Sequence, residues 1–174
     1  VGDWITKSES DYMCIKDPRI PYCYILPKIH KGVSPPPGRP IVSGIGSVLE
    51  PLSQFADAFL HPIVQKTPTY LKDTADALRV LTQIPFEPQT QMLVGLDVES
   101  LYTSIPQDAS LDVVEDILFS GPWEYQTPRH FILECARLAL KKNYFQFEDT
   151  IYLQTHGRST GSTFAPSVAG LYVH

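Results

Sequence analysis

One aspartate in the middle of the chain, Asp97, follows directly after a run of apolar residues. The run is residues 93–96 (LVGL), and the aromatic Tyr102 follows five residues after the aspartate. An apolar strand that ends in a carboxylate places that carboxylate at a sheet edge beside a cleft. There it is able to hold Mg²⁺, which takes one or two protein carboxylates together with substrate phosphates. The pattern is therefore typical of magnesium-dependent chemistry on phosphates, but an aspartate that only caps a turn after a strand gives the same pattern.

Basic and acidic residues are separated along the chain. Residues 16–39 contain five Lys or Arg and one acid, whereas residues 81–128 contain eight acids and no Lys or Arg. The net charge of −5 has the wrong sign for a protein that binds nucleic acid over its whole surface. A basic wall that faces an acidic site, however, suits a polyanion held by metal ions. The alternative is chance clustering on a solvated face.

The composition is that of an ordinary globular protein. The chain has 174 residues, of which 43% are hydrophobic and 19% charged, so it is one domain or a piece of a larger one. No apolar run approaches the roughly 20 residues of a membrane span, and no secretory signal is visible. The first residue is not Met and the last residues read as the middle of an element, so we expect a fragment. Three cysteines without close pairing favour a reducing, intracellular compartment; nucleus and cytoplasm are not distinguished.

Apolar spacing, prolines and capping residues predict the elements that position these groups. We expect an α+β fold in which helices pack on a small antiparallel sheet. The predicted strands are residues 22–26 and 41–43, joined across a proline-rich loop, a central strand at residues 91–98, and a hairpin at residues 144–154. The predicted helices are residues 47–61 with a capping box of Ser47 and Glu50, 74–84 capped by Asp73, one beginning near Ser110, 128–142, and 163–173.

Four blocks of sequence together resemble a reverse transcriptase of the Penelope-like retroelement group. They are residues 24–31 (YILPKIHK), 38–44 (GRPIVSG), 96–106 (LDVESLYTSIP) and 154–166 (QTHGRSTGSTFAP), in the family's order. The resemblance implies a right-hand polymerase that makes DNA on an RNA template. Residues of about 20–90 would form the fingers and the helices leading into the palm, and about 91–174 would form part of the palm. The palm would stop before the motif that carries the second catalytic carboxylate.

The resemblance also implies roles for ten residues. Asp97 would be catalytic and would ligate two Mg²⁺ ions, with the carbonyl group of Val98 as a further metal ligand. Nucleotide binding would fall to Lys28 and Arg39, which grip the triphosphate, to Tyr102, which stacks under the sugar, and to Thr160 and Gly161. Contacts with nucleic acid would fall to Lys31, Ala165 and Pro166. The implied partners are an RNA template, a DNA primer and dNTP, with no membrane.

Two departures from the family pattern leave other interpretations open. Thr160 stands where the family has Met or Gln, and the chain contains no Asp-Asp pair for the second carboxylate motif. We therefore expect no polymerase activity from these 174 residues alone. One alternative is a catalytically dead, polymerase-derived module that binds nucleic acid or protein. Another is a plain α+β domain, in which Asp97, Arg39 and Tyr102 would not converge on one cleft.

Overall fold

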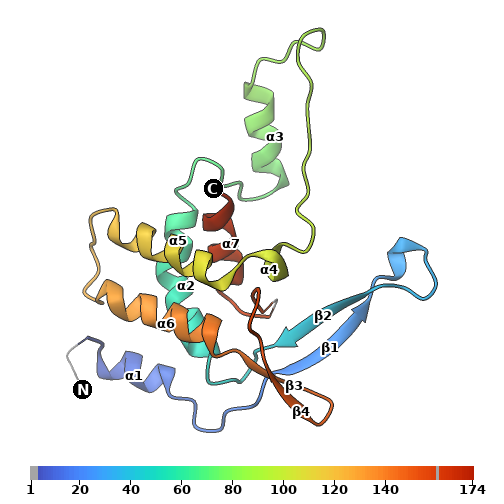
Figure 1. Cartoon of the computed structure of the whole chain (residues 1–174). Coiled ribbons are helices and arrows are strands. Elements are labelled where there is room, and N and C mark those ends of the chain that lie inside the picture. The colour runs from blue at the N-terminus through green and yellow to red at the C-terminus, as the bar shows by residue number, and fades with distance from the viewer. Residues whose placement is uncertain (1–3, 160) are drawn as a thin grey trace.

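The computed structural model describes residues 4–159 and 161–174, which form an α+β fold of seven α-helices and a small four-stranded mixed sheet (Figure 1). None of the helices in these residues combines the length and apolar character that crossing a bilayer requires. The elements in chain order are α1 (Lys7–Met13), β1 (Tyr22–Pro27), the 3₁₀ helix η1 (Ile29–Lys31), β2 (Gly38–Ser43), α2 (Glu50–Val64), α3 (Thr74–Gln83), α4 (Leu101–Ser104), α5 (Gln107–Phe119), α6 (Arg129–Lys141), β3 (Tyr144–Phe147), β4 (Thr150–Leu153) and α7 (Ala165–Val173).

The sheet consists of two hairpins joined side by side, in the order β2-β1-β3-β4. Both hairpins are antiparallel, as the sequence predicts. The prediction of a wholly antiparallel sheet is wrong where they meet, because β1 and β3 pair in parallel through Tyr22 and Gln146. The N–H of Gln146 donates to the carbonyl group of Pro21 at 2.7 Å, which fixes this junction just before β1 begins.

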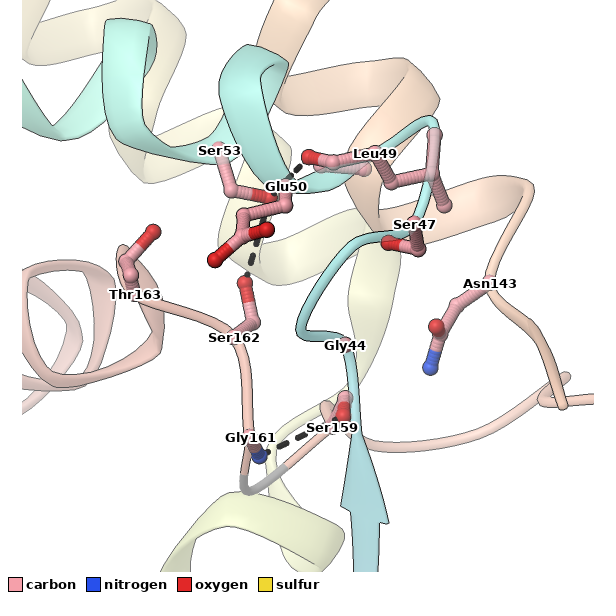
Figure 2. Close-up of a pocket in the computed structure, with 11 residues that line it drawn as sticks. Gly44, Ser47, Leu49, Glu50, Ser53, Asn143, Ser159, Gly161, Ser162 and Thr163 are labelled. Carbon is pink, nitrogen blue, oxygen red and sulfur yellow. Dashed lines mark hydrogen bonds between the residues drawn. The ribbon is translucent and has the colours of Figure 1, made fainter. Parts of the chain in front are cut away.

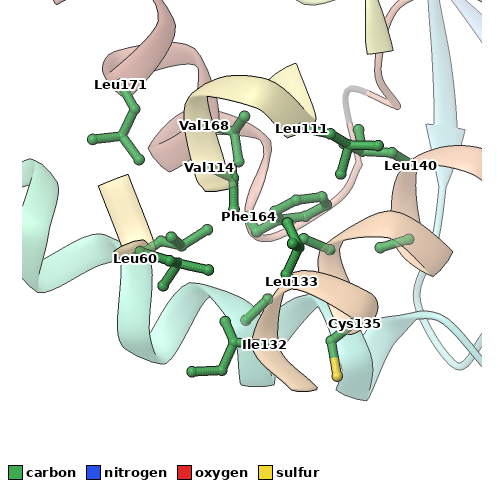
Figure 3. Close-up of a cluster of buried hydrophobic side chains, with 14 of the residues drawn as sticks. Leu60, Leu111, Val114, Ile132, Leu133, Cys135, Leu140, Phe164, Val168 and Leu171 are labelled. Atoms are coloured by element: carbon green, nitrogen blue, oxygen red, sulfur yellow. The ribbon is translucent and has the colours of Figure 1, made fainter. Parts of the chain in front are cut away.

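The hydrophobic core lies among the helices α2, α5, α6 and α7 (Figure 3). The spacing of Leu111, Val114, Ile117 and Leu118 predicts one apolar face on α5. Leu111, Val114 and Leu118 are buried, and Ile117 is half-buried against the same core. Phe164, at the start of α7, is the largest fully buried side chain. The apolar periodicity therefore identifies the core-facing side of α5 correctly.

The ends of α2 differ from the prediction. The Glu50 carboxylate accepts a hydrogen bond from the N–H of Gly46 at 2.6 Å, so Ser47 and Glu50 do not form the expected capping box. The N-cap residue is Leu49, which makes no capping hydrogen bond through its side chain. The helix also continues through Pro62 to Val64. A proline removes one helical hydrogen bond, but Val64 is buried in the core, and this burial favours the extra turn.

Two short helices were not predicted, and one predicted helix starts earlier than expected. The first, α1, is stabilised by a capping box in which the Thr6 hydroxyl accepts from the N–H of Glu9 and the Glu9 carboxylate accepts from the N–H of Thr6. The second is the single turn α4. The helix expected near Ser110 begins three residues before it, at Gln107, directly after Pro106.

The largest difference concerns residues 91–98, which were predicted to form a central strand but belong to no strand. Leu93 is 74% exposed and Leu96 is 94% exposed. The preceding helix, α3, begins at Asp73 as predicted, yet none of its side chains is buried. A strand needs a hydrogen-bonded neighbour, and apolar periodicity does not provide one. Figure 1 shows that α3 and residues 84–99 project from the helical body. Residues 84–99 are hereafter called the arm.

Candidate nucleic-acid interface

The β1–β2 hairpin carries three of the predicted binding residues near its outer end. Lys28 follows β1, Lys31 ends η1, and Arg39 is the second residue of β2. The N–H of Lys28 donates to the carbonyl group of Pro37 at 2.8 Å, and Arg39 is paired with Leu26 across the hairpin. Strand pairing therefore holds the three basic residues in one region, which projects away from the helices in Figure 1.

The positive charge of this hairpin end is not offset by acidic residues of the hairpin. Residues 22–43 contain no Asp or Glu. Lys31 and Arg39 are exposed, Lys28 is half-buried, and the salt bridges found among the described residues involve other cations. Exposed cations without acidic partners attract a polyanion, and this attraction weakens as salt concentration rises.

Asp97 and Val98 lie on the arm, where the chain approaches α4. Both side chains are exposed. Among the described residues, no three His, Cys, Asp or Glu side chains come close enough to hold a metal ion. Mg²⁺ requires near-octahedral oxygen coordination, which one carboxylate and one carbonyl group cannot complete for two ions. The donors present in this part of the chain therefore do not fit a two-magnesium site.

The segment that carries Tyr102 packs against the glycine-containing residues 157–159 and 161, hereafter the turn. The carbonyl group of Tyr102 accepts from the N–H of Arg158 at 2.8 Å. A β-carbon at Gly157 would lie 2.5 Å from the Thr103 carbonyl oxygen, and the φ angle of this glycine is +66°. The buried side chain of Gln107 donates to the Gly157 carbonyl group at 3.1 Å. The turn and α4 are thus held together through backbone contacts that require glycine.

The other side of the turn packs against the end of β2. The Ser159 hydroxyl donates to the Val42 carbonyl group at 3.1 Å, and a β-carbon at Gly161 would lie 2.1 Å from the same oxygen. Thr160, one of the predicted nucleotide-binding residues, lies outside the described residues. Blocks 38–44, 96–106 and 154–166 therefore meet at this turn.

A small polar cavity lies where the turn meets the start of α2 (Figure 2). Its volume is about 20 Å³, which is room for a single water molecule. The Ser162 hydroxyl donates to Ser53 at 3.3 Å, and the Ser53 hydroxyl donates to the Leu49 carbonyl group at 2.8 Å. Hydroxyl groups and the Glu50 carboxylate form most of its polar lining. The cavity is too small for a nucleotide. It is part of the packing between the turn and the start of α2.

Arg158 is a buried residue of this region that the sequence reasoning missed. It is 2% exposed, and its Nη1 donates to the Ala165 carbonyl group at 3.2 Å. Its Nε and Nη2 have no hydrogen-bond partner among the described residues. Burial lowers the pKa of this guanidinium to about 10, and Tyr102 and Tyr172 oppose the shift. An arginine in a polar turn is normally exposed, so the sequence held no signal for its burial.

Ala165 and Pro166 begin α7, as the helical prediction requires. Pro166 stands in the first turn, where a missing N–H costs no helical hydrogen bond. Ala165 is 1% exposed, whereas Pro166 is exposed. Of this pair, only Pro166 presents its side chain to a ligand in solution.

The structure therefore brings together some of the predicted site residues and not others. Lys28, Lys31 and Arg39 share the hairpin, and the backbone of Tyr102 contacts the turn that contains Gly161. Gly161 also lines the small cavity, but the side chains of Asp97, Arg39 and Tyr102 do not.

Comparison with known proteins adds no family assignment. No protein-family model matches the chain, and no curated protein matches it. The assignment of a function therefore depends on the sequence blocks and on the contacts between them.

Proposed function

We propose that the chain is the fingers and partial palm of a reverse transcriptase, which makes DNA on an RNA template as part of a longer protein. The observation that carries this proposal is the meeting of three sequence blocks at one turn. Gly161 lies against Val42, and Arg158 is hydrogen-bonded to Tyr102. The blocks were selected from the sequence resemblance alone, and a plain α+β domain gives no reason for them to meet. Asp97, Arg39 and Tyr102 do not line one cavity, however, and this agrees with what a plain domain predicts.

The basic hairpin supplies the charge that such a function needs. Arg39 lies on β2, the strand whose other end contacts the turn through Val42. A guanidinium binds phosphate oxygens through two parallel hydrogen bonds, so Arg39 is suited to a triphosphate. Lys28 and Lys31 add positive charge along the same hairpin and attract the phosphates of a template or primer.

The residues of this chain bind and orient substrates in this proposal. The described residues lack the ligands of a two-magnesium site, so nucleotidyl transfer would need further acids from the longer protein. Tyr102, held by its backbone against the turn, would limit the space under the sugar of the bound nucleotide. The compartment would be intracellular and reducing, in keeping with the three free cysteines.

A second candidate function is a polymerase-derived module that binds nucleic acid without catalysis. The position of Asp97 favours it, because this carboxylate is exposed on the arm and does not line the cavity beside Gly161. Both functions require the hairpin to bind nucleic acid. They differ in whether a longer chain extends a primer.

A binding measurement tests what the two functions share. The affinity of the 174-residue chain for a primed RNA template is followed by fluorescence anisotropy at several salt concentrations. Lys31→Glu with Arg39→Glu should weaken binding and reduce the slope of log K against log salt by about 1 to 2. Lys7→Glu with Lys66→Glu makes the same change in net charge elsewhere and should have a smaller effect. Equal effects of the two double variants would remove the hairpin from the interface.

A primer-extension assay separates the two functions. A longer chain from the same source should incorporate dNTP on an RNA template if the first function holds. Arg39→Lys in that chain should raise the KM for dNTP more than it weakens primer–template affinity, because lysine cannot form the paired hydrogen bonds of a guanidinium. Binding without any templated incorporation would favour the non-catalytic module.

A further inference from the structure

A groove outside the proposed nucleic-acid interface combines an apolar floor with two cations. It lies between the loop before β1, the turn before α2 and the start of β3, and its volume is about 190 Å³. Its lining includes the large, well-exposed side chains of Ile20, Val48 and Tyr144. Arg19 and Lys142 stand in the same lining. The groove is therefore suited to a ligand that is both apolar and anionic.

The two cations are available to such a ligand. The N–H of Arg19 donates to the Gly46 carbonyl group at 2.8 Å, and the stem of its side chain lies over Gly46. This contact holds Arg19 in place while its side chain remains exposed. Lys142 directly follows α6 as its C-cap residue and is also exposed. The salt bridges of the described residues are made by Arg79, Arg137 and Lys141, so neither Arg19 nor Lys142 is already neutralised.

The arm has the complementary composition. Met92, Leu93 and Leu96 are its most exposed apolar side chains. Residues 84–99 contain three acids and no Lys or Arg. Among the described residues, no hydrogen bond involves the backbone of residues 92–98. A segment that exposes both apolar side chains and unpaired backbone groups is a template for association with another chain.

The arm cannot fill the groove of its own molecule. In Figure 1 the arm projects at one end of the helical body, beside the C-terminus. The loop between α1 and β1 and the start of β3, which border the groove, lie at the opposite end. An arm that fills this groove must therefore come from another molecule.

We propose that the chain forms a reciprocal dimer in which the arm of each copy docks into the groove of the other. Leu93 and Leu96 would contact the apolar floor, and the acids of the arm would face Arg19 and Lys142. Because the exchange is reciprocal, the two contacts close a twofold assembly and no arm is left free. Asp97 is one of the three acids of the arm. The inference uses no other residue of the proposed nucleic-acid or metal site, and the variants that test it change none of those residues.

Charge reversal on each surface tests this dimer. Sedimentation velocity should show a monomer–dimer equilibrium for the wild-type chain that weakens as salt concentration rises. Arg19→Glu with Lys142→Glu makes the groove acidic, and Glu87→Lys with Glu99→Lys makes the arm basic. Each double variant alone places like charges opposite one another, so its dimerisation should weaken at least about tenfold.

Mixing the two double variants gives the decisive result. In an equimolar mixture, both contacts of a heterodimer pair opposite charges again, so dimers should return at close to the wild-type affinity. Leu96→Gln should weaken the wild-type dimer through the apolar contact, whereas Lys7→Glu with Lys66→Glu should leave it unchanged. Circular dichroism checks that each variant is folded.

Several outcomes would overturn the dimer. These are a wild-type chain that stays monomeric at all accessible concentrations, variants that associate like the wild type, and a mixture that does not regain the dimer. Growth beyond a dimer would exclude the reciprocal arrangement. Association that requires added nucleic acid would assign the self-association to nucleic-acid binding.

Discussion

Gly161 lies so close to Val42 that a β-carbon on the glycine would be 2.1 Å from the valine carbonyl oxygen. A residue with a β-carbon does not fit this contact unless the backbone moves. The contact joins the turn to the end of β2, and the Ser159 hydroxyl adds a hydrogen bond to the same carbonyl group. The strand that carries Arg39 is thereby attached to the turn that also contacts α4.

Gly161→Ala should therefore separate the turn from β2. Forcing a methyl group into a closely packed position typically costs about 1 to 3 kcal/mol, and we expect a loss of this size in the free energy of unfolding. Gly95→Ala is the matched control, because a β-carbon at Gly95 meets nothing within 4 Å. The control should change stability by less than about 0.5 kcal/mol. Urea unfolding of the three proteins measures both effects, and equal stabilities would show that the turn does not rest on β2.

Replacing the buried guanidinium of Arg158 by an apolar side chain should stabilise the fold. Buried charge is costly when donors lack partners, and replacing buried ionic groups by apolar ones is often neutral or stabilising by about 1 to 4 kcal/mol. Arg158→Met loses the hydrogen bond to Ala165, worth about 1 kcal/mol. We therefore expect a net gain of up to about 3 kcal/mol in the free energy of unfolding.

Arg137→Met is the control for Arg158→Met. Arg137 is on the surface and paired with Glu134 at 3.0 Å, so its replacement should change stability little. Denaturant unfolding at neutral pH compares the two variants with the wild type. A clear loss of stability in Arg158→Met would mean that Nε and Nη2 of Arg158 have hydrogen-bond partners in solution, which would contradict this prediction.

The sequence predicts local structure well where the signal is local. The hairpin across the proline-rich loop, the second hairpin around Glu148 and the helix capped by Asp73 all follow from turn and capping chemistry, and all are present. The buried face of α5 follows from apolar spacing. These predictions depend only on residues that are close together in the chain.

Structure that depends on contacts between residues far apart in the chain is predicted poorly from the sequence. An apolar run such as residues 93–96 becomes a strand only when a neighbouring strand accepts and donates its backbone hydrogen bonds. The parallel junction at Tyr22 and the burial of Arg158 likewise depend on segments far away in the chain. The candidate site shows the same limit, because the resemblance identified Tyr102 and Gly161 but not Arg158, which lies in the same turn as Gly161 and is hydrogen-bonded to Tyr102.

The three cysteines should differ sharply in reactivity. Burial raises the pKa of the Cys135 thiol to about 11, and the charge of Glu134 adds to this shift. Because the thiolate is the reactive form, Cys135 should react with a thiol reagent at pH 8 only after unfolding. Cys14 is exposed and should react at once, and the half-buried Cys23 should react more slowly. Fast labelling of all three in the folded chain would contradict the burial of Cys135.

The same pKa shift makes stability depend on pH. The pKa of Cys135 is raised in the folded state above its ordinary value of 9.0, so the folded state holds the proton more tightly than the unfolded state does. This contribution to stability is fully present below pH 9 and is lost as pH rises toward 11. Cys135→Ala should be less stable at neutral pH because of the cavity. Its stability should fall less steeply than that of the wild type between these two pH values.

Asp97 gives the last prediction, because its environment decides whether this chain alone is an enzyme. A single exposed carboxylate beside a carbonyl group binds Mg²⁺ weakly, since the ion gives up its water reluctantly. The melting temperature of the 174-residue chain should therefore be the same in Mg²⁺ and in EDTA, and Asp97→Asn should not alter that result. No templated incorporation of dNTP is expected from this chain.

In a longer chain whose further acids complete the site, Asp97→Asn should lower incorporation about 100-fold or more, because an electrostatic catalytic group is lost. Primer extension on an RNA template measures both chains. Magnesium-dependent incorporation by the 174 residues alone would disprove this account of Asp97, and so would an Asp97→Asn longer chain that extends primers at the wild-type rate.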